Sequence, residues 1–297
     1  MQKFSLILFI FFFLILSFFL KEFFIELKNF IPYLLGLIMF GMGTTLKLYQ
    51  IKEIFHKPIW IFVTLLLQYS IMPILAFLLV IIFEFPSEIA LGFIILGSCP
   101  GGTASNVIAY ICRANLPLSI CCTFVSTGLA VVFTPTLIYF FADESVNIDV
   151  FSLIKSTFFI VFLPVFLGIS LNFILKEKDP SYLNFFPLFS EISIALIIAI
   201  IFSVNFNNLN EVSLIIIIAV ILHNLLGLVL GIFFSNLLKF PDDVKKTISI
   251  EVAMQNSGLG MTLALMHYTK IVALPSAIFS LWHNISASVL VYLWKKK

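Results

Sequence analysis

Apolar residues follow one another for long stretches in this chain, and the pattern repeats from one end to the other. Of the 297 residues, 61% are hydrophobic and 11% are charged. A helix of about 20 apolar residues spans the hydrocarbon core of a bilayer, and the chain offers about ten such runs with short connections. The sequence therefore predicts an all-α polytopic membrane protein without a soluble enzyme domain.

The predicted membrane segments are separated by polar turns and charges. They are 4–20, 30–48, 59–83, 87–113 with a break near 100–106, 117–141, 151–175, 187–206, 212–238, 244–270 with a break near 255–260, and 273–294. We interpret the first as a retained helix and not as a signal peptide, because its apolar run is long and has no small-x-small cleavage site.

Lysine and arginine are distributed unevenly over the connections. With the amino terminus inside, thirteen of them face the cytoplasm and four face outward. The cytoplasmic set is Lys3, Lys47, Lys52, Lys57, Arg113, Lys176, Lys178, Lys239, Lys245, Lys246, Lys295, Lys296 and Lys297, and the outer set is Lys21, Lys28, Lys155 and Lys270. Because cytoplasmic loops carry the excess of positive charge, we expect a multi-pass protein of the inner (plasma) membrane with both termini in the cytoplasm.

The two halves of the chain, about 1–148 and 149–297, each hold five predicted segments. Since five is odd, the second half crosses the membrane in the opposite direction to the first. The breaks fall in the fourth segment of each half, as in secondary transporters built from inverted repeats. The predicted fold is thus one transmembrane domain, 1–297, of ten helices in two inverted five-helix repeats, with discontinuous helices 4 and 9 crossing near the midplane.

Two polar, glycine-containing stretches produce the breaks. The first is 97–106 (GSCPGGTASN) and the second is 251–260 (EVAMQNSGLG). Non-helical backbone within a membrane must be buried in protein or line a cavity. Gln68 and the pair His223–Asn224 lie at matching distances before the two breaks. We expect the two breaks to form one ligand site.

Glu251 is the residue in this region that most demands a partner. A carboxylate in the apolar interior costs at least about 2.5–3.5 kcal/mol, and no lysine or arginine is placed deep enough to offset it. A bound alkali ion would supply the missing charge, with oxygen ligands from Ser105, Asn106, Ser119 and Thr123. The alternative is that the serine and threonine hydroxyls bond back to their own helices or join neighbouring ones.

The half-helices that start after the breaks favour an anionic substrate. Their first turns present unpaired N–H groups and a positive dipole end, and Gly101 and Gly102 leave this backbone accessible. The glycines could instead serve close helix crossing. His283 could reach the same cavity or bond a neighbouring carbonyl, and His223 is typical of a core histidine.

The sequence offers little support for catalysis or for transition-metal binding. The cysteines, Cys99, Cys112, Cys121 and Cys122, lack metal-binding spacing, and we interpret them as small core residues. The nearest enzyme hypothesis is an intramembrane hydrolase that uses a serine with His223 or His283, but no Gly-x-Ser-x-Gly elbow or aspartate pair is present.

The residues at the breaks resemble those of the bile acid:sodium symporter family, and the chain is similar to a bacterial member. The resemblance is carried by 99–106 (CPGGTASN), 113–119 (RANLPLS), 251–257 (EVAMQNS) and 282–284 (WHN), and it spans essentially the whole chain. Related arsenite carriers have Pro-Cys-Thr at the first break. Here Cys99 precedes Pro100, which argues against metalloid transport.

The resemblance implies a panel domain of helices 1, 2, 6 and 7, a core domain of helices 3–5 and 8–10, and two sodium sites. By this carry-over the first sodium is held by Ser105, Asn106, Ser119, Thr123 and Glu251. The second is held by Gln68, Glu251 and Gln255 with backbone oxygens of Val252 and Met254. Substrate is expected near Thr103, Asn256, His283 and Asn284.

Together these observations predict a sodium-coupled importer of an organic anion, bile-acid-like or a small carboxylate such as pantoate, that works by alternating access. Sodium is the coupling ion, and no other cofactor, nucleic acid or obligate protein partner is expected. The alternatives are a proton-coupled or uncoupled anion carrier, in which Glu251 titrates, and a substrate-sensing membrane protein.

Overall fold

A computed structural model describes residues 5–45, 58–144, 146–175, 185–206 and 214–295. Regular structure in these ranges is helical, apart from one isolated β-bridge between Gly101 and Gln255. The elements are α1 (Ser5–Phe19), α2 (Lys21–Glu26), the 3₁₀ turn η1 (Leu27–Phe30), α3 (Ile31–Thr45), α5 (Pro58–Phe83), α6 (Ser87–Ser98), α7 (Ala104–Ile111), α8 (Leu116–Phe141), α9 (Val150–Thr157), the π-helical η2 (Phe158–Phe162), α10 (Leu163–Leu175), α11 (Phe185–Val204), α12 (Leu214–Leu237), α13 (Asp242–Ala253), α14 (Ser257–His267), the 3₁₀ turn η5 (Ile271–Ala273) and α15 (Leu274–Lys295).

The prediction of an all-helical polytopic membrane protein is confirmed. Six helical stretches are long and apolar enough to cross a bilayer, namely Lys21–Thr44, Pro58–Phe83, Leu116–Phe141, Val150–Ile174, Leu214–Leu237 and Ile271–Trp294. Shorter apolar helices add Leu8–Phe19, Ser87–Ser98 and Leu188–Val204. Many large apolar side chains are exposed, such as Phe19 at 76% and Phe140 at 72%, which suits a surface in contact with lipid.

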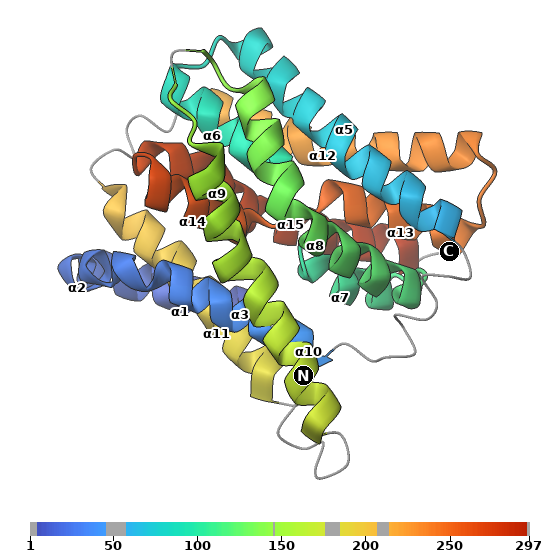
Figure 1. The fold of residues 1–297 in the computed structure, drawn as a ribbon, viewed down its shortest axis with the longest axis horizontal. Helices are drawn as coiled ribbons and strands as arrows, with labels where there is room; N and C mark the ends of the chain where they lie inside the picture. Colours follow the sequence, from blue (N-terminus) through green and yellow to red (C-terminus); the bar gives the residue numbers. More distant parts are fainter. Residues whose placement is uncertain (1–4, 46–57, 145, 176–184, 207–213, 296–297) are drawn as a thin grey trace.

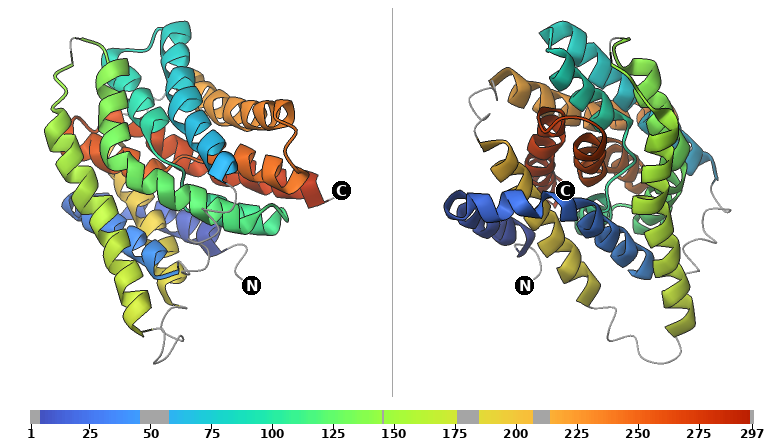
Figure 2. Two further views of the ribbon diagram at one scale, coloured as in Figure 1. Left: turned by 45° about the vertical axis from the view of Figure 1, so that its right-hand side comes forward. Right: turned by 60° about the vertical axis from the view of Figure 1, so that its left-hand side comes forward.

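The helices pack in two groups. In the first, α3 lies between α10 and α11, and α1 packs on α11. In the second, α5 and α12 pack on α13, and α6 packs on α5, α8 and α15. Figures 1 and 2 show the first group along one side of the molecule and the second along the other. The pair α3–α10 crosses closely at Gly43 and Gly168, because a Cβ at either position would overlap a backbone carbonyl of the other helix.

The predicted segments 30–48 and 151–175 correspond to the candidate spans Lys21–Thr44 and Val150–Ile174, and the structure adds a local feature to each. The segment 151–175 is not a uniform helix, since η2 inserts one π-helical turn between α9 and α10. The connection before residue 30 is also largely helical, as α2 and η1 fill it. A π turn is a rare single-turn feature inside α-helices, and the Phe-rich apolar sequence of this segment did not predict it.

The two breaks are confirmed, but they are shorter than predicted. Residues 104–106 already belong to α7, and 257–260 belong to α14, so the non-helical stretches are 99–103 and 254–256. Asn256 explains the second boundary, because its side chain accepts from the N–H of Leu259 and caps α14. The four cysteines are buried, as expected of small core residues.

The turns that precede the two broken helices have the same construction. Glu84 and Lys239 have φ angles of 50° and 54°. Each is followed by phenylalanine and then by proline, and Pro86 and Pro241 are the N-cap residues of α6 and α13. Those helices are both 12 residues long. A left-handed residue ends the preceding helix, and a proline starts the next one where its missing N–H costs nothing.

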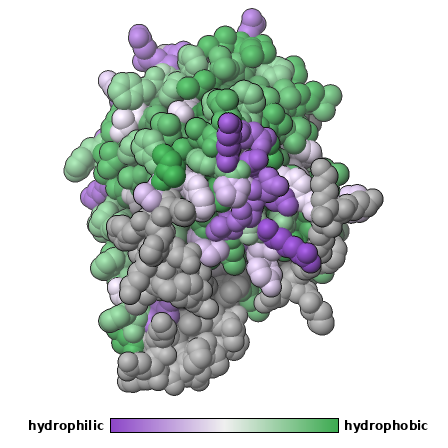
Figure 3. Space-filling view, turned by 90° about the vertical axis from the view of Figure 1, so that its right-hand side faces the viewer, coloured by the Kyte–Doolittle hydropathy of each residue, from purple (hydrophilic) through white to green (hydrophobic). Residues whose placement is uncertain are grey.

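Hydrophilic residues gather at one end of the molecule, around the start of α13 and the turn between α7 and α8 (Figure 3). Asn115 joins these two elements. Its side chain accepts from Leu118 N–H at 3.1 Å to cap α8 and donates to Asp243 Oδ2 at 2.9 Å. Its N–H donates to Thr247 Oγ1 at 2.8 Å. The turn is therefore held to the beginning of α13.

We expect Asn115→Ala to lower the melting temperature of the purified protein by about 3 °C or more, because it removes a helix cap and an interhelical hydrogen bond together. Asn115→Ser retains a capping oxygen but loses the bond to Asp243, so it should fall between wild type and alanine. The melting temperature is measured by tryptophan fluorescence during a thermal scan. If the alanine variant melted at the same temperature as wild type, this role of Asn115 would be contradicted.

Candidate functional site

The two breaks pair with each other through their backbones. Gly102 N–H donates to Met254 O at 2.6 Å, and Asn256 N–H donates to Pro100 O at 2.8 Å. These bonds flank the antiparallel bridge between Gly101 and Gln255. Backbone polar groups within a membrane need partners inside the protein, and each break supplies partners to the other. The result is one crossing that joins α6–α7 to α13–α14.

On one side of the crossing, the five residues predicted for the first sodium site come together. Ser105 and Asn106 extend from α7, Ser119 and Thr123 from α8, and Glu251 from α13. Ser119 Oγ donates to Glu251 Oε1, and Thr123 Oγ1 donates to Glu251 Oε2 at 2.9 Å. Glu251 is 2% exposed, and Ser105, Ser119 and Thr123 are fully buried. The ligand set inferred from the sequence is thus a real spatial cluster.

In this cluster, which we call the Glu251 cluster, three hydroxyl groups, those of Ser105, Ser119 and Thr123, face the Asn106 amide oxygen and the carboxylate, so oxygen lone pairs outnumber the hydroxyl protons. Ser119 Oγ lies 2.9 Å from Asn106 Oδ1 and is also bonded to Glu251. Thr123 Oγ1 faces Asn106 Oδ1 at 3.3 Å, Ser119 O at 3.1 Å and a carboxylate oxygen of Glu251. A hydroxyl has one proton to donate. Several oxygen lone pairs therefore face one another in a buried site.

No basic side chain offsets the charge of Glu251 within the described residues. The ion pair found there joins Lys245 to Asp242 at 3.3 Å, away from the cluster. The described residues also contain no group of three histidine, cysteine, aspartate or glutamate side chains that could hold a metal ion together. The cluster is instead built from hard oxygen donors with a single carboxylate, the chemistry suited to an alkali cation.

Gln68 and Gln255, predicted for a second sodium site, are in direct contact. Gln68 of α5 donates from Nε2 to Gln255 Oε1 at 2.8 Å and to Cys99 O at 2.9 Å. Within the described chain, Gln68 Oε1 and Gln255 Nε2 have no hydrogen-bond partner. Val252 and Met254 are buried beside them, but Met254 O already accepts from Gly102. The structure therefore brings Gln68 and Gln255 together, while Glu251 lies four residues before Gln255 in the last turn of α13 and is bonded to Ser119 and Thr123.

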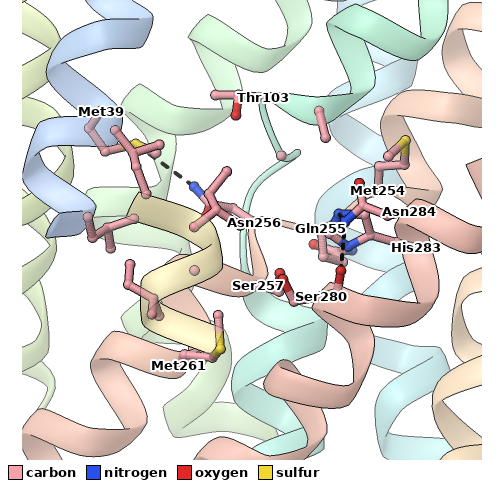
Figure 4. A pocket seen from close by; sticks show the side chains of 17 residues that line it. Met39, Thr103, Met254, Gln255, Asn256, Ser257, Met261, Ser280, His283 and Asn284 are labelled. Atoms are coloured by element: carbon pink, nitrogen blue, oxygen red, sulfur yellow. Dashed lines mark hydrogen bonds between the residues drawn. The ribbon is translucent and has the colours of Figure 1, made fainter. Parts of the chain in front are cut away.

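On the other side of the crossing lies a cavity of about 50 Å³, which we call the central cavity. All the residues predicted to face substrate line it, namely Thr103, Asn256, His283 and Asn284. Figure 4 shows these side chains around the cavity, with Asn256 directed toward Met39 and Asn284 beside His283. Asn284 Nδ2 donates to Ser280 O at 2.7 Å. None of the described residues that line the cavity is a lysine or arginine.

The first turns of α7 and α14 both face the central cavity. Thr103 and Ala104 at the start of α7 and Ser257 and Gly258 at the start of α14 line it. The beginning of a helix carries a partial positive charge. Several first-turn N–H groups, such as those of Ser257, Leu259 and Gly260, already donate within the chain, so what the two helix starts present to the cavity is mainly this partial charge.

Sequence reasoning missed two parts of the site. The opposite wall of the central cavity is apolar and comes from α3 and α11, through Met39 and Ile197 among others, and apolar residues in apolar helices give no signal. The second is a support for the break before α14. Asn224 donates to Ala253 O at 2.9 Å and accepts from Trp282 Nε1 at 3.2 Å. Its neighbour His223 bonds Met72 O at 3.1 Å, as the core interpretation of that histidine predicts.

Two interrupted helices that cross in a polytopic membrane protein, with polar residues gathered at the crossing, define the architecture of a secondary transporter. Comparisons with known proteins agree with this class. The sequence matches the model of the Sodium Bile acid symporter family over residues 32–212. The chain belongs to this family, and it is a membrane transporter and not an enzyme.

Similar proteins occur in bacteria, plants and animals. The chain is 42% identical over 285 residues to the sodium-dependent transporter YocS of Bacillus subtilis, covering 96% of this chain and 89% of that protein. It is 36% identical over 263 residues to the probable sodium/metabolite cotransporter BASS1 of Arabidopsis thaliana, covering 88% and 66%. It is 26% identical over 249 residues to the ileal sodium/bile acid cotransporter of Oryctolagus cuniculus, covering 82% and 72%.

Proposed function

We propose that the protein is a sodium-coupled symporter that imports an organic anion across the plasma membrane by alternating access. The substrate is a carboxylate, either small, such as pantoate, or larger and bile-acid-like. The names of the relatives support the coupling ion, since a bacterial one is called sodium-dependent and the plant and rabbit ones are called sodium cotransporters.

The observation that carries the proposal is the excess of acceptors in the Glu251 cluster. Ser119 and Thr123 cannot donate at once to every oxygen within reach, and the carboxylate has no basic partner in the described chain. A sodium ion among these oxygens would satisfy the lone pairs and offset the charge. We assign Ser105, Asn106, Ser119, Thr123 and Glu251 to this ion.

A second ion is proposed beside Gln68 and Gln255, with Glu251 shared between the two sites and backbone oxygens of Val252 and Met254 completing the set. The unpartnered oxygen of Gln68 supports this assignment, because a buried carbonyl oxygen without a donor is costly. Both ions would contact α13 just before the crossing. Sodium binding would thereby hold the crossing in the arrangement that shapes the central cavity.

Substrate is proposed to bind at the central cavity with its carboxylate near the starts of α7 and α14. Thr103, Asn256, His283 and Asn284 supply hydrogen-bonding groups there. At about 50 Å³ the cavity is too small for an organic anion, since ligand pockets occupy roughly 300–1,000 Å³. Transport therefore requires the wall of α3 and α11 to separate from α14 and α15.

The proposed topology is two inverted repeats of five helices, with both termini in the cytoplasm. The matched turns at 84–86 and 239–241 support it, because they precede two broken helices of equal length in the two halves. The helices that pack around α3 and α11 would form the panel domain, and those around α5, α12 and α13 the core. Movement of the panel against the core would switch the exposure of the cavity.

We expect sodium to raise the melting temperature of the purified protein, with potassium at equal ionic strength as the control, because a ligand that binds the folded state alone stabilises it. A carboxylate that is transported should add to this shift only when sodium is present. The measurement is a thermal scan across a panel of carboxylates, sulfonates and bile salts. If the melting temperatures in sodium and potassium were equal and uptake were driven by a pH gradient, the hypothesis of sodium coupling would be rejected in favour of proton coupling.

A further inference from the structure

A second cavity, of about 370 Å³, lies away from the crossing, between α2–η1, the end of α11 and the turn before η5. Its polar lining consists of Lys21, Glu22, Lys28, Ser203 and Lys270. We call it the rim cavity. Figure 1 places α2 and the end of α14 at the opposite end of the molecule from the hydrophilic face in Figure 3. The distribution of basic residues assigns this end to the outside.

At the outer end of the molecule, the basic side chains are concentrated around the rim cavity. Three of the four outer lysines line it, with one carboxylate, Glu22, among them. The fourth, Lys155, is exposed on α9 and is not part of the lining. Three positive charges and one negative charge leave the lining with an excess of two positive charges. Like charges gathered around a hollow attract an anion into it.

Ser203 provides an independent indication of a ligand. It is fully buried on α11, and its hydroxyl has no hydrogen-bond partner in the described chain. Many buried helical hydroxyls bond back to a carbonyl one turn earlier, as Thr157 does to Leu153 O at 2.8 Å and Ser235 to Gly231 O at 2.7 Å. Ser203 belongs with Ser98, Thr127 and Ser276 to the buried hydroxyls without a partner in the described chain, and of these four it is the one that lines the rim cavity. A buried hydroxyl without a partner is costly. Ser203 belongs to the lining of the cavity, and a small opening of that lining would expose its unpartnered hydroxyl to an anionic oxygen.

The elements around the rim cavity also position its charges. Lys21 lies over the ring of Phe206, 4.9 Å from the centroid, which holds its ammonium group at the end of α11. α2 packs on α11, and Lys270 approaches from the turn that joins α14 to η5. The cavity therefore lies between the helices around α11 and those around α14.

We propose that the rim cavity binds a carboxylate or phosphate group, which the hydroxyl of Ser203 and the lysines Lys28 and Lys270 hold. This inference rests on the proposed function: the bound anion is the transported substrate, captured before it reaches the central cavity. The central cavity has no lysine or arginine in its described lining, so it has no side chain to attract the anion over a distance. The rim cavity supplies that attraction at the outer end.

The test is a titration of the full-length protein in phosphatidylcholine nanodiscs with inorganic phosphate, in potassium buffer at constant ionic strength. We expect the double variant Lys28→Gln, Lys270→Gln to raise the Kd for phosphate about tenfold, and Ser203→Ala about threefold. Lys155→Gln is the matched control, because it removes an outer lysine that does not line the cavity, and it should leave the Kd unchanged. In sodium-driven uptake, the double variant should raise KM and leave the maximal rate unchanged.

A second arm identifies the source of the anion. If phosphatidylglycerol in the nanodiscs competes with phosphate in wild type, and the double variant changes phosphate binding but not KM, the site is an anion site occupied by a lipid headgroup. The proposal is overturned if Lys155→Gln loses as much affinity for phosphate as the double variant does. It is also overturned if wild type binds no phosphate and retains no phosphatidylglycerol. Loss of sodium-dependent uptake in wild type would instead contradict the proposed function, and the phosphate titration would still decide on the rim cavity.

Discussion

Glu251→Gln is expected to abolish sodium-stimulated uptake, with the rate falling to that in potassium buffer. Glutamine has nearly the same shape, but it removes the carboxylate charge of the Glu251 cluster, on which both proposed ions depend. It also replaces one acceptor oxygen by an amide donor. The measurement is uptake of a labelled carboxylate into proteoliposomes with a sodium gradient, compared with a potassium gradient.

The same variant should remain folded, and this separates loss of sodium binding from loss of structure. Without sodium, a buried carboxylate has to be accommodated without a basic partner, at a cost of a few kcal/mol. Glutamine lowers that cost, and its amide protons reach the surplus oxygens of Asn106 and Ser119. The melting temperature of Glu251→Gln in potassium should therefore equal or exceed that of wild type, and sodium should no longer raise it.

Glu88→Gln provides the control for removing a carboxylate. Glu88 is exposed at the start of α6 and accepts from Thr269 Oγ1 at 2.6 Å, outside the Glu251 cluster. It should keep sodium-stimulated uptake and the sodium-dependent melting shift. Sodium-driven uptake at the wild-type rate in Glu251→Gln would refute the assigned role. Uptake by wild type in sodium-free buffer, driven by a pH gradient, would indicate that Glu251 binds a proton instead.

The predicted site residues stand out in the sequence because their chemistry conflicts with their surroundings. Glu251, Gln68 and the polar residues of the two breaks stand in apolar runs, and a membrane tolerates such residues where they have partners. The pairing of the two breaks followed from their matching places in the two halves. The structure brings the side chains of the Glu251 cluster together and places Gln68 in contact with Gln255.

Other features had no sequence signal because they depend on residues that are distant in the chain. The rim cavity combines 21–28 with Ser203 and Lys270, and nothing local connects them. The apolar wall of the central cavity comes from α3 and α11, whose residues are of the same kind as those facing lipid. The boundaries of the breaks were missed because Asn256 acts as a helix cap, which is a local choice that polarity alone does not reveal.

The second large effect is expected at Gly102, where the two breaks approach most closely. Its N–H donates to Met254 O at 2.6 Å. A Cβ added there would lie 2.8 Å from Gln255 O and 3.2 Å from Gln255 C. These are backbone atoms that cannot rotate away, so Gly102→Ala must push the two breaks apart. Overpacking of this kind costs about 1–3 kcal/mol.

The consequence for transport should exceed the consequence for stability. Gly102 lines the central cavity, and Gln255 and Met254 belong to the second proposed ion site, so one displacement disturbs substrate and sodium together. We expect Gly102→Ala to reduce sodium-driven uptake at least about tenfold, since small misplacements of binding groups have effects of that order or larger. The sodium-dependent melting shift should shrink in parallel.

Gly128→Ala is the matched control. Gly128 lies in α8, and a Cβ there would meet no atom within 4 Å. Alanine at such a helical position restricts the unfolded chain and leaves stability equal or higher by about 0.4–1 kcal/mol. Uptake should stay at the wild-type rate. If Gly102→Ala matched Gly128→Ala in both uptake and sodium shift, the paired backbones of the two breaks would not be what holds the ion and substrate sites in place.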